Sequence, residues 1–246
     1  MPIYGEDLAY VHHVGFTQAL RHAVPHLLST LRQHGVTSGT VVDLGCGSGV
    51  WTRALTNAGY RVTGVDASLA MLRLARREAP RAAFHQASLF QAAIPPCAAV
   101  TAVGECLNYD AGGDGVTTRQ RLVDELLQRV FRQLRPGGLF VFDIHARTSA
   151  PGMRRRKVFR AGRDWSIFHE ARINGTGTRL LRYIRVSRRL GMRIRSGAEV
   201  HVLHLYDPAK LVSMMERAGF QVRTVDGYGS VPLLPGRVGF VARKPE

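Results

Sequence analysis

The fold of this chain is decided by one stretch, Val41-Val42-Asp43-Leu44-Gly45-Cys46-Gly47-Ser48-Gly49. A short apolar strand over residues 40–42 leads into an acid and then into a loop with glycine at every second position. Glycine adopts positive φ at little cost and has no Cβ, so a ligand can lie directly against this backbone. A helix over about residues 50–58 follows, and its first N–H groups point toward the same ligand. The stretch therefore predicts a strand, a ligand-binding loop and a helix.

A loop of this kind can bind either a dinucleotide or S-adenosylmethionine, and two residues distinguish them. Val50 occupies the third position of the dinucleotide fingerprint, where close helix packing requires Gly or Ala. Asp43 would repel a pyrophosphate but attract the ammonium of a methionyl group. Both residues favour S-adenosylmethionine as the cofactor.

The segment Asp43–Gly49 resembles the first motif of class I S-adenosylmethionine-dependent methyltransferases. A second strand over residues 61–65 ends in Asp66-Ala67-Ser68, which is similar to that family's second motif, and the resemblance continues through residues 134–143. It implies an α/β fold. We expect a Rossmann-like seven-stranded, mostly parallel sheet with helices on both faces and the last strand antiparallel between its neighbours.

The resemblance also implies how the cofactor binds. Asp66 ends the second strand at the carboxyl edge of the sheet, where its carboxylate can accept both ribose hydroxyls. Met71, one helical turn further, either covers the adenine ring or fills the core. The family often has an acid near Ser88 for the adenine amino group, so the hydroxyl or backbone of Ser88 must substitute here. The implied cofactor-binding residues are Asp43, Gly45, Cys46, Gly47, Gly49, Asp66, Ala67, Met71, Ser88, Leu89, Gly104 and Glu105.

The acceptor site is expected around the segment Gly104–Tyr109, which resembles the substrate-facing segment of small-molecule methyltransferases. The predicted substrate contacts are Tyr4, Tyr10, Asn108 and Tyr109. An amine acceptor needs only to be unprotonated, whereas a hydroxyl needs a base. The candidate bases, in order of preference, are Tyr109, His145, His13 and Glu105.

The chain divides into three predicted parts. Residues 1–35 form an N-terminal helical lid, which Pro25 kinks or divides, with His12 and Phe16 as further lid candidates. Residues 36–145 and 205–246 form the cofactor-binding domain, with a turn at residues 136–138 and a helix opening at Thr118. Residues 146–204 show period-two apolar positions and form an inserted cap of three or four antiparallel strands. A homodimer through this insert is a further prediction.

The three cysteines, Cys46, Cys97 and Cys106, are too few for a disulfide framework, which favours a cytoplasmic protein. Cys97 precedes the fourth strand, at the edge opposite the cofactor, so it is not expected to be a nucleophile. The N-terminus lacks the features of a signal peptide, and no apolar run approaches the ~18 residues of a membrane span. No metal-ligand spacing occurs, so no metal site is expected.

The chain has a formal net charge of +16, and most of the excess lies in the insert. Between Pro151 and Ser196, thirteen arginines and one lysine face only Asp164 and Glu170. This pattern is typical of a nucleic-acid-binding surface, but also of a solvated, arginine-rich sheet. An acidic small-molecule acceptor would also suit it.

Three functions follow from these observations. The first is methyl transfer from S-adenosylmethionine to an N or O atom of a small molecule, favoured by the segment Gly104–Tyr109. The second is methylation of RNA or another nucleic acid, favoured by the basic insert. The third is a non-catalytic S-adenosylmethionine-binding protein.

Overall fold

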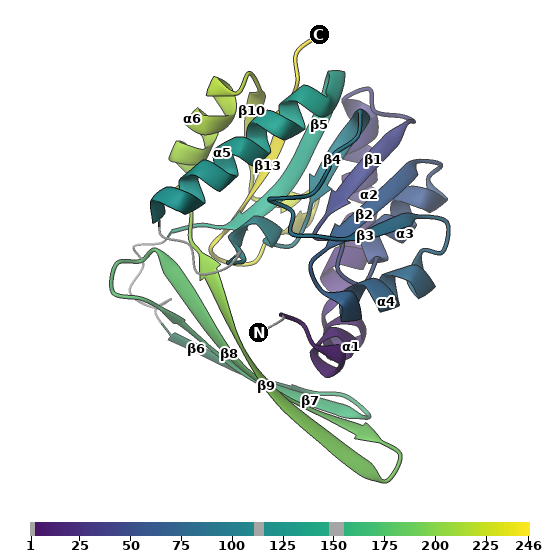
Figure 1. Cartoon of the computed structure of the whole chain (residues 1–246), viewed down its shortest axis with the longest axis vertical. Coiled ribbons are helices and arrows are strands. Elements are labelled where there is room, and N and C mark those ends of the chain that lie inside the picture. Colours follow the sequence, from purple (N-terminus) through teal and green to yellow (C-terminus); the bar gives the residue numbers. More distant parts are fainter. Residues whose placement is uncertain (1–2, 111–115, 148–154) are drawn as a thin grey trace.

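A seven-stranded sheet organises the computed structural model, in the order β10-β13-β5-β4-β1-β2-β3 (Figure 1). Its strands are β10 (Gln221–Val225), β13 (Arg237–Arg243), β5 (Leu134–His145), β4 (Cys97–Ala102), β1 (Thr40–Leu44), β2 (Arg61–Asp66) and β3 (Ala83–Gln86). Strands β1 to β5 pair in parallel, whereas β13 is antiparallel to both of its neighbours. The structure describes residues 3–110, 116–147 and 155–246. The predicted Rossmann-like sheet is confirmed.

Helices cover both faces of this sheet (Figure 1). Helices α2 (Gln18–Gln33) and α3 (Val50–Asn57) pack on one face, and α5 (Val116–Gln133) and α6 (Pro208–Arg217) pack on the other. The remaining elements are α1 (Glu6–Phe16), α4 (Leu69–Glu78), the 3-10 helix η1 (Cys106–Asn108) and the short strands β11 (Gly227–Tyr228) and β12 (Val231–Pro232). No helix within the described segments is both long and apolar enough to cross a bilayer.

The sheet interior explains why β5 is apolar almost throughout. Phe140 and Phe142 lie on one face of β5, and the ring centroids of this pair are 4.4 Å apart. Phe142 stacks on Phe240 of β13 at 4.8 Å. Leu139 and Val141 alternate with them and pack on the opposite face, against α2 and α3. A central strand covered on both sides requires apolar residues at successive positions.

A second sheet follows β5 in the chain and is antiparallel, as predicted for the insert. Its strands are β6 (Arg155–Ala161), β7 (Trp165–Ile173), β8 (Arg179–Leu190) and β9 (Arg193–His204), which pair in that order. One face carries Ile167 and Ile184, which pack against Leu8 and Val11 of α1. We call this face the inner face of the insert, because it lies toward the core (Figure 1).

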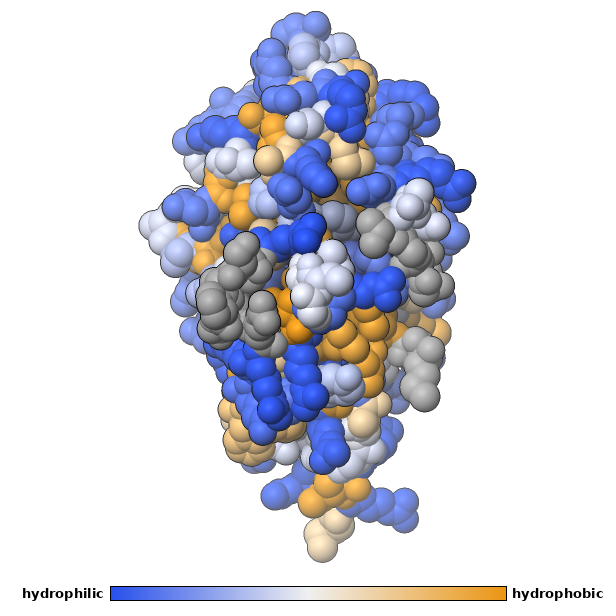
Figure 2. All heavy atoms as spheres, turned by 90° about the vertical axis from the view of Figure 1, so that its left-hand side faces the viewer, coloured by the Kyte–Doolittle hydropathy of each residue, from blue (hydrophilic) through white to orange (hydrophobic). Residues whose placement is uncertain are grey.

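The hairpin between β8 and β9 exposes apolar side chains. Met192 is fully exposed and Ile194 is 71% exposed. Figure 2 shows apolar residues beside hydrophilic ones at this lower end of the molecule. The homodimer expected through the insert stays a prediction.

The N-terminal segment differs from its prediction in two ways. The helix break falls at Thr17, between α1 and α2, whereas Pro25 lies inside α2 without ending it. Loss of one backbone hydrogen bond at Pro25 is offset by burial of Leu27 and Leu31 against the sheet. Only α1 therefore lies beside the insert, and α2 belongs to the core layer.

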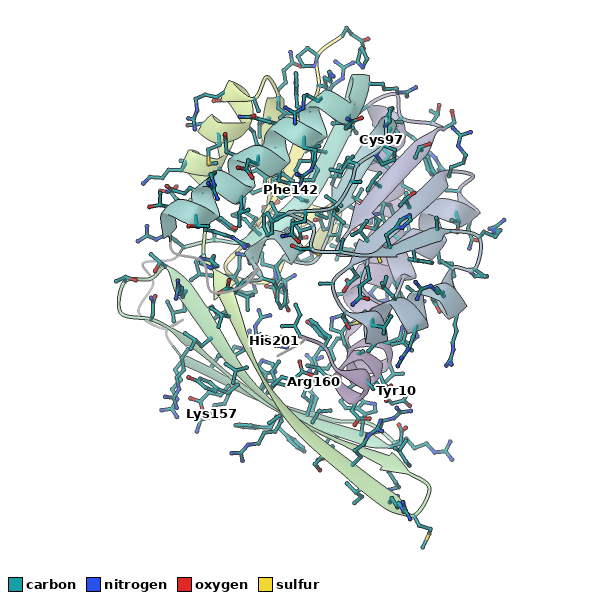
Figure 3. The ribbon with its side chains drawn as sticks, in the orientation of Figure 1. Tyr10, Cys97, Phe142, Lys157, Arg160 and His201 are labelled. Carbon is teal, nitrogen blue, oxygen red and sulfur yellow. The ribbon has the colours of Figure 1, made fainter. Side chains whose placement is uncertain are left out.

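Three smaller boundaries also differ. Helix α5 begins at Val116 instead of Thr118. The turn expected at residues 136–138 is part of β5, where Gly137 has a φ of 72° and the register with β4 shifts. Cys97 is the first residue of β4, and Figure 3 shows it at the end of the core sheet far from the insert.

Candidate active site

The glycine loop after β1 lies at the carboxyl edge of the sheet and adopts positive φ at three positions. Gly45, Gly47 and Gly49 have φ values of 67°, 53° and 84°. A Cβ on Gly45 would lie 2.5 Å from Sγ of Cys106, and one on Gly49 would lie 2.8 Å from Cα of Ala75. A Cβ on Gly47 would meet no atom within 4 Å. Gly45 and Gly49 thus allow close packing, whereas Gly47 faces open space.

Asp66 joins this loop to the tip of β2. Its Oδ2 accepts the N–H of Gly47 at 2.9 Å, and its Oδ1 accepts the N–H of Ser68 at 2.8 Å. Burial raises the pKa of Asp66, although these two bonds oppose the shift. Each carboxylate oxygen retains a lone pair, so the half-buried side chain can still accept hydroxyl groups of a ligand. At the same edge of the sheet, just after β4, Gly104 has a φ of 102°, and a Cβ there would also meet no atom within 4 Å.

Asp43 corrects the sequence-based expectation, because its carboxylate faces the interior. It is 2% exposed and accepts hydroxyl hydrogen bonds from Thr52 at 2.7 Å and Thr101 at 3.0 Å. Burial raises its pKa to about 6, although the two hydroxyls oppose this. Trp51 donates to Thr101 at 3.1 Å, so the group ties α3 to β1 and β4. Asp43 thus supports the strand that leads into the glycine loop, and its role in cofactor binding stays a prediction.

The remaining predicted cofactor residues lie around the same edge with different exposure. The side chain of Met71, on α4, is 2% exposed. This burial agrees with a core role and not with cover for an adenine ring. Cys46 is buried and Ala67 is exposed. Ser88 and Leu89 are half-buried, and the hydroxyl of Ser88 accepts the N–H of Phe90 at 3.3 Å.

Glu105, at the carboxyl end of β4, is held between two arginines that the sequence did not single out. Arg182 of β8 binds both carboxylate oxygens, one of them at 3.1 Å, and Arg237 of β13 binds Oε2 at 2.9 Å. Burial alone would raise the pKa of Glu105, but the two arginines outweigh it and hold that pKa at about 2. A carboxylate this acidic with both oxygens engaged cannot serve as the base, so that expectation is wrong.

The backbone at Glu105 is fixed by Asp143, the acid near the carboxyl end of β5. Asp143 is fully buried and accepts the N–H groups of Gly104 at 2.6 Å and Glu105 at 3.0 Å, as well as the hydroxyl of Tyr228 at 2.8 Å. Glu105 itself has a φ of 59°, which is uncommon for a residue with a side chain. These bonds hold the strained turn that aims Glu105 at the two arginines.

A cluster of aromatic side chains lies next to Glu105. The hydroxyls of Tyr4 and Tyr109 are 2.8 Å apart, and the Tyr4 ring centroid lies 4.9 Å from that of His201 and 5.3 Å from that of His12. Burial raises the pKa of Tyr109 to about 12, so it stays protonated at neutral pH and is a poor base. Burial lowers the pKa of His12 to about 4, which leaves this imidazole neutral.

The predicted substrate residues Asn108 and Tyr10 point elsewhere. Asn108 is fully buried; its Oδ1 accepts the N–H of His145 and its Nδ2 donates to the carbonyl groups of His145 and His204. It therefore fastens η1 to the ends of β5 and β9. Tyr10 donates its hydroxyl to Asp164 at 2.7 Å in the contact between α1 and the insert. Polar partners within the protein bind both side chains, and their contact with an acceptor stays a prediction.

Two predicted histidines remain near the edge. His13 lies 2.9 Å from the hydroxyl of Ser48 through Nδ1, which links α1 to the glycine loop. Burial lowers the pKa of His145, so its imidazole is neutral at pH 7 and able to accept a proton. No group of three or more His, Cys, Asp or Glu side chains gathers for a metal ion in the described parts of the chain.

The reversed strand β13, the glycine loop after β1 and the acid at the tip of β2 together define a class I methyltransferase fold. The chain belongs to the methyltransferase-domain family, whose sequence profile matches residues 16–225. The resemblance noted in the sequence is thereby confirmed for the family and the fold.

Curated relatives match about half of this chain. Trans-aconitate 2-methyltransferase of Paracidovorax citrulli (strain AAC00-1) is 35% identical over 127 residues, which are 51% of this chain and 46% of that protein. Glycine N-methyltransferase of Rattus norvegicus is 34% identical over 133 residues, 48% of this chain and 43% of that protein. The chain thus spans less than half the length of these relatives.

Solved structures cover nearly the whole chain. An S-adenosylmethionine-dependent methyltransferase from Clostridium acetobutylicum ATCC 824 superposes with a TM-score of 0.79 at 16% identity, covering 96% of this chain and 99% of that one. The S-adenosylmethionine-bound amino pentose methyltransferase CalS10 from Micromonospora echinaspora gives 0.73 at 18% identity, covering 99% of each chain. At these identities the likeness concerns the fold.

Proposed function

We propose that this chain transfers a methyl group from S-adenosylmethionine to an N or O atom of a small, acidic molecule. The observation that carries the proposal is the bond from the Gly47 N–H to Asp66, which sets a carboxylate beside an open backbone loop at the carboxyl edge. Gly47 and Asp66 would hold the cofactor, together with the open backbone at Gly104. When bound, the cofactor supplies a methyl carbon activated by a positive sulfur.

The protein's own residues then orient the acceptor and remove a proton where one must leave. His145 is the base that we favour over Tyr109, because its imidazole is neutral at pH 7 while the Tyr109 phenol keeps its proton. Tyr109 instead orients the acceptor through its hydroxyl, which already bonds that of Tyr4. An amine acceptor that arrives unprotonated needs only this orientation.

Charge on the inner face of the insert supports an acidic acceptor. Arg182 is matched there by Glu105, and Arg195 is matched by Asp7 at 2.5 Å. These arginines therefore contribute little net charge to the inner face. Arg188 also lies on this face and shares Asp7 with Arg195, so the excess positive charge comes from Arg188 and from the edge strand β6.

Strand β6 supplies two arginines without a carboxylate partner among the described residues, Arg156 and Arg160. The register pairs Arg160 with Ile167, which is buried against α1, so both arginines lie on the inner face. Figure 3 shows Arg160 toward the core and Lys157 on the far side of the sheet. Half-buried His169 lies close enough to both arginines for their charges to lower its pKa, in addition to the larger effect of burial.

We expect the double variant Arg156→Ala, Arg160→Ala to lose affinity for acidic ligands. Calorimetry with citrate and pyrophosphate as probes should show a loss of roughly tenfold or more, because charge-assisted bonds are removed. Arg185→Ala is the matched control, since Arg185 pairs with exposed Phe168 on the outer face. An equal loss in the control would indicate general attraction to surface charge and would favour the nucleic-acid alternative.

Methyl transfer itself is tested by incubating the protein with methyl-labelled S-adenosylmethionine and a panel of carboxylic acids, phosphorylated metabolites and amines. We expect release of S-adenosylhomocysteine with at least one acidic acceptor. Cofactor binding without turnover on any acceptor class would favour the non-catalytic alternative.

A further inference from the structure

The carboxylate of Glu199, on the inner face of β9, lies at the N-terminus of α1. Its Oε2 accepts the N–H of Tyr4 and its Oε1 accepts the N–H of Gly5, both at 2.8 Å. His201 binds the same carboxylate through Nε2 at 2.8 Å and is 1% exposed. The first residues of the described chain are thus attached to a strand almost two hundred positions away.

Glu199 caps the N-terminus of α1, where the N-cap residue makes no side-chain hydrogen bond. The N-cap residue Gly5 has no side chain, so the free N–H groups at the start of α1 have no local acceptor. A carboxylate at a helix N-terminus satisfies these groups and is favoured by the helix dipole. Figure 1 shows the start of α1 between the core sheet and the insert.

Tyr4 is held at three points, each from a different part of the protein. Its N–H bonds Glu199 of the insert, its carbonyl accepts the hydroxyl of Ser68 at 2.7 Å, and its own hydroxyl meets Tyr109 at 2.8 Å. Ser68 is also the residue whose N–H binds Asp66. Tyr4 therefore connects the tip of β2, where the cofactor ribose is expected, with the expected acceptor site.

The conformation of Tyr4 shows that these contacts act against a local preference. Its φ is 56°, in the left-handed region that residues with a side chain rarely adopt. Such a conformation persists only where surrounding contacts determine it. The two N–H bonds to Glu199 flank this residue directly and are the contacts best placed to impose it.

Leu8 and Val11 also hold α1 against the insert by apolar burial, but the ion pairs of its first turn involve more exposed side chains than Glu199. Asp7 pairs with Arg195 and Glu6 pairs with Arg73, but both arginines are about half exposed, at 47% and 57%. Exposed pairs of this kind contribute little. Glu199 is only 17% exposed and bonds the main chain.

We propose that Glu199 is a positioning residue that holds the N-terminal segment, with Tyr4, closed over the methyl-transfer site. His201 orients the Glu199 carboxylate for this task. The insert then controls when the cofactor enters and its product leaves, because Tyr4 must release Glu199 before it can move away from Ser68 and Tyr109. We call the bonds from Glu199 to the N–H groups of Tyr4 and Gly5 the latch. The latch rests on contacts within the protein itself, whereas its effect on cofactor exchange rests on the proposed function.

Hydrogen exchange of the ligand-free protein tests the latch directly. In Glu199→Gln we expect amide exchange over residues 4–10 to rise roughly tenfold or more, because the amide group cannot accept both N–H bonds. Exchange in β4 and β5 should stay unchanged. Glu216→Gln is the control, since Glu216 is exposed on α6, away from α1. Unchanged exchange over residues 4–10 in the Glu199 variant would overturn the proposal.

A second variant covers the case in which Glu199→Gln fails to fold. Glu199→Asp keeps the charge but shortens the side chain by one methylene, so the carboxylate can no longer reach the N–H groups of both Tyr4 and Gly5. It should raise exchange over the same residues and speed release of S-adenosylhomocysteine by a similar factor; normal exchange would refute the latch. If the wild-type protein does not bind S-adenosylhomocysteine at all, the proposed function fails, while the exchange result still decides the latch.

Discussion

Replacing Glu105 with alanine is expected to lower the free energy of unfolding by about 3–5 kcal/mol. The substitution leaves Arg182 and Arg237, whose side chains are 19% and 18% exposed, without the carboxylate that both of them bind. A buried charge that loses its partner keeps its desolvation cost, so the loss exceeds that of an ordinary surface pair. Urea unfolding of the two proteins measures the difference, and a change below about 1 kcal/mol would contradict the account of this cluster.

Glu170 offers a matched control, because it also binds two arginines. Arg155 and Arg172 contact its Oε1, but they are 57% and 53% exposed on the outer face of the insert. Water replaces the lost carboxylate there, so Glu170→Ala should change stability little. A loss as large as that in Glu105→Ala would show that burial does not decide the effect.

The Glu105 cluster also sets a pH dependence with a definite sign. The pKa of Glu105 is about 2 in the folded protein and near 4.5 in an unfolded chain. Because the folded pKa is the lower one, the stabilisation of roughly 3 kcal/mol is complete above pH 4.5 and is lost as the pH falls toward 2. Glu105→Gln should remove this part of the acid sensitivity, and an identical stability loss in both proteins over that range would contradict it.

The second large effect is expected at Asp66. Asp66→Ala should weaken binding of S-adenosylmethionine on the order of 100-fold or more, because it removes the acceptor for two ribose hydroxyls at about 1.5–3 kcal/mol each. It also leaves the N–H groups of Gly47 and Ser68 without their partner. Isothermal calorimetry gives both affinities.

Asp43→Asn is the variant to compare with Asp66→Ala, because Asp43 is the acid of the first cofactor-binding motif and Asp66 is the acid of the second. Asp43 faces Thr52 and Thr101 and not the open edge, so the isosteric amide should reduce affinity much less than Asp66→Ala does. A loss at Asp43 equal to or larger than that at Asp66 would mean that the interior carboxylate, and not the one at the tip of β2, carries the interaction.

The core sheet was predictable because its signals are local. Buried parallel strands leave apolar runs of a few residues, as over residues 40–42 at the start of β1. The caps of α4 and α6 are local contacts as well, because Ser68 and Asp207 accept N–H groups only two or three positions away. The break at Thr17 was missed because proline is only an indirect helix-stop signal.

The site was less predictable because its contacts join distant segments. Glu105 meets Arg182 and Arg237 only through the register of two sheets, and nothing local distinguishes Arg182 from the other arginines of the insert. The direction of Asp43 was misjudged for a related reason. Strand β1 is covered on both faces, so alternation of apolar and polar residues does not reveal which side a given residue faces.

The central claim is that the carboxyl edge around Gly47 and Asp66 binds S-adenosylmethionine. Titration of the protein with S-adenosylhomocysteine and, separately, with NAD tests it most directly. The account predicts saturable binding of S-adenosylhomocysteine that Asp66→Ala abolishes, and no binding of NAD. Binding of NAD in place of S-adenosylhomocysteine, or binding of S-adenosylhomocysteine that Asp66→Ala leaves unchanged, would contradict it.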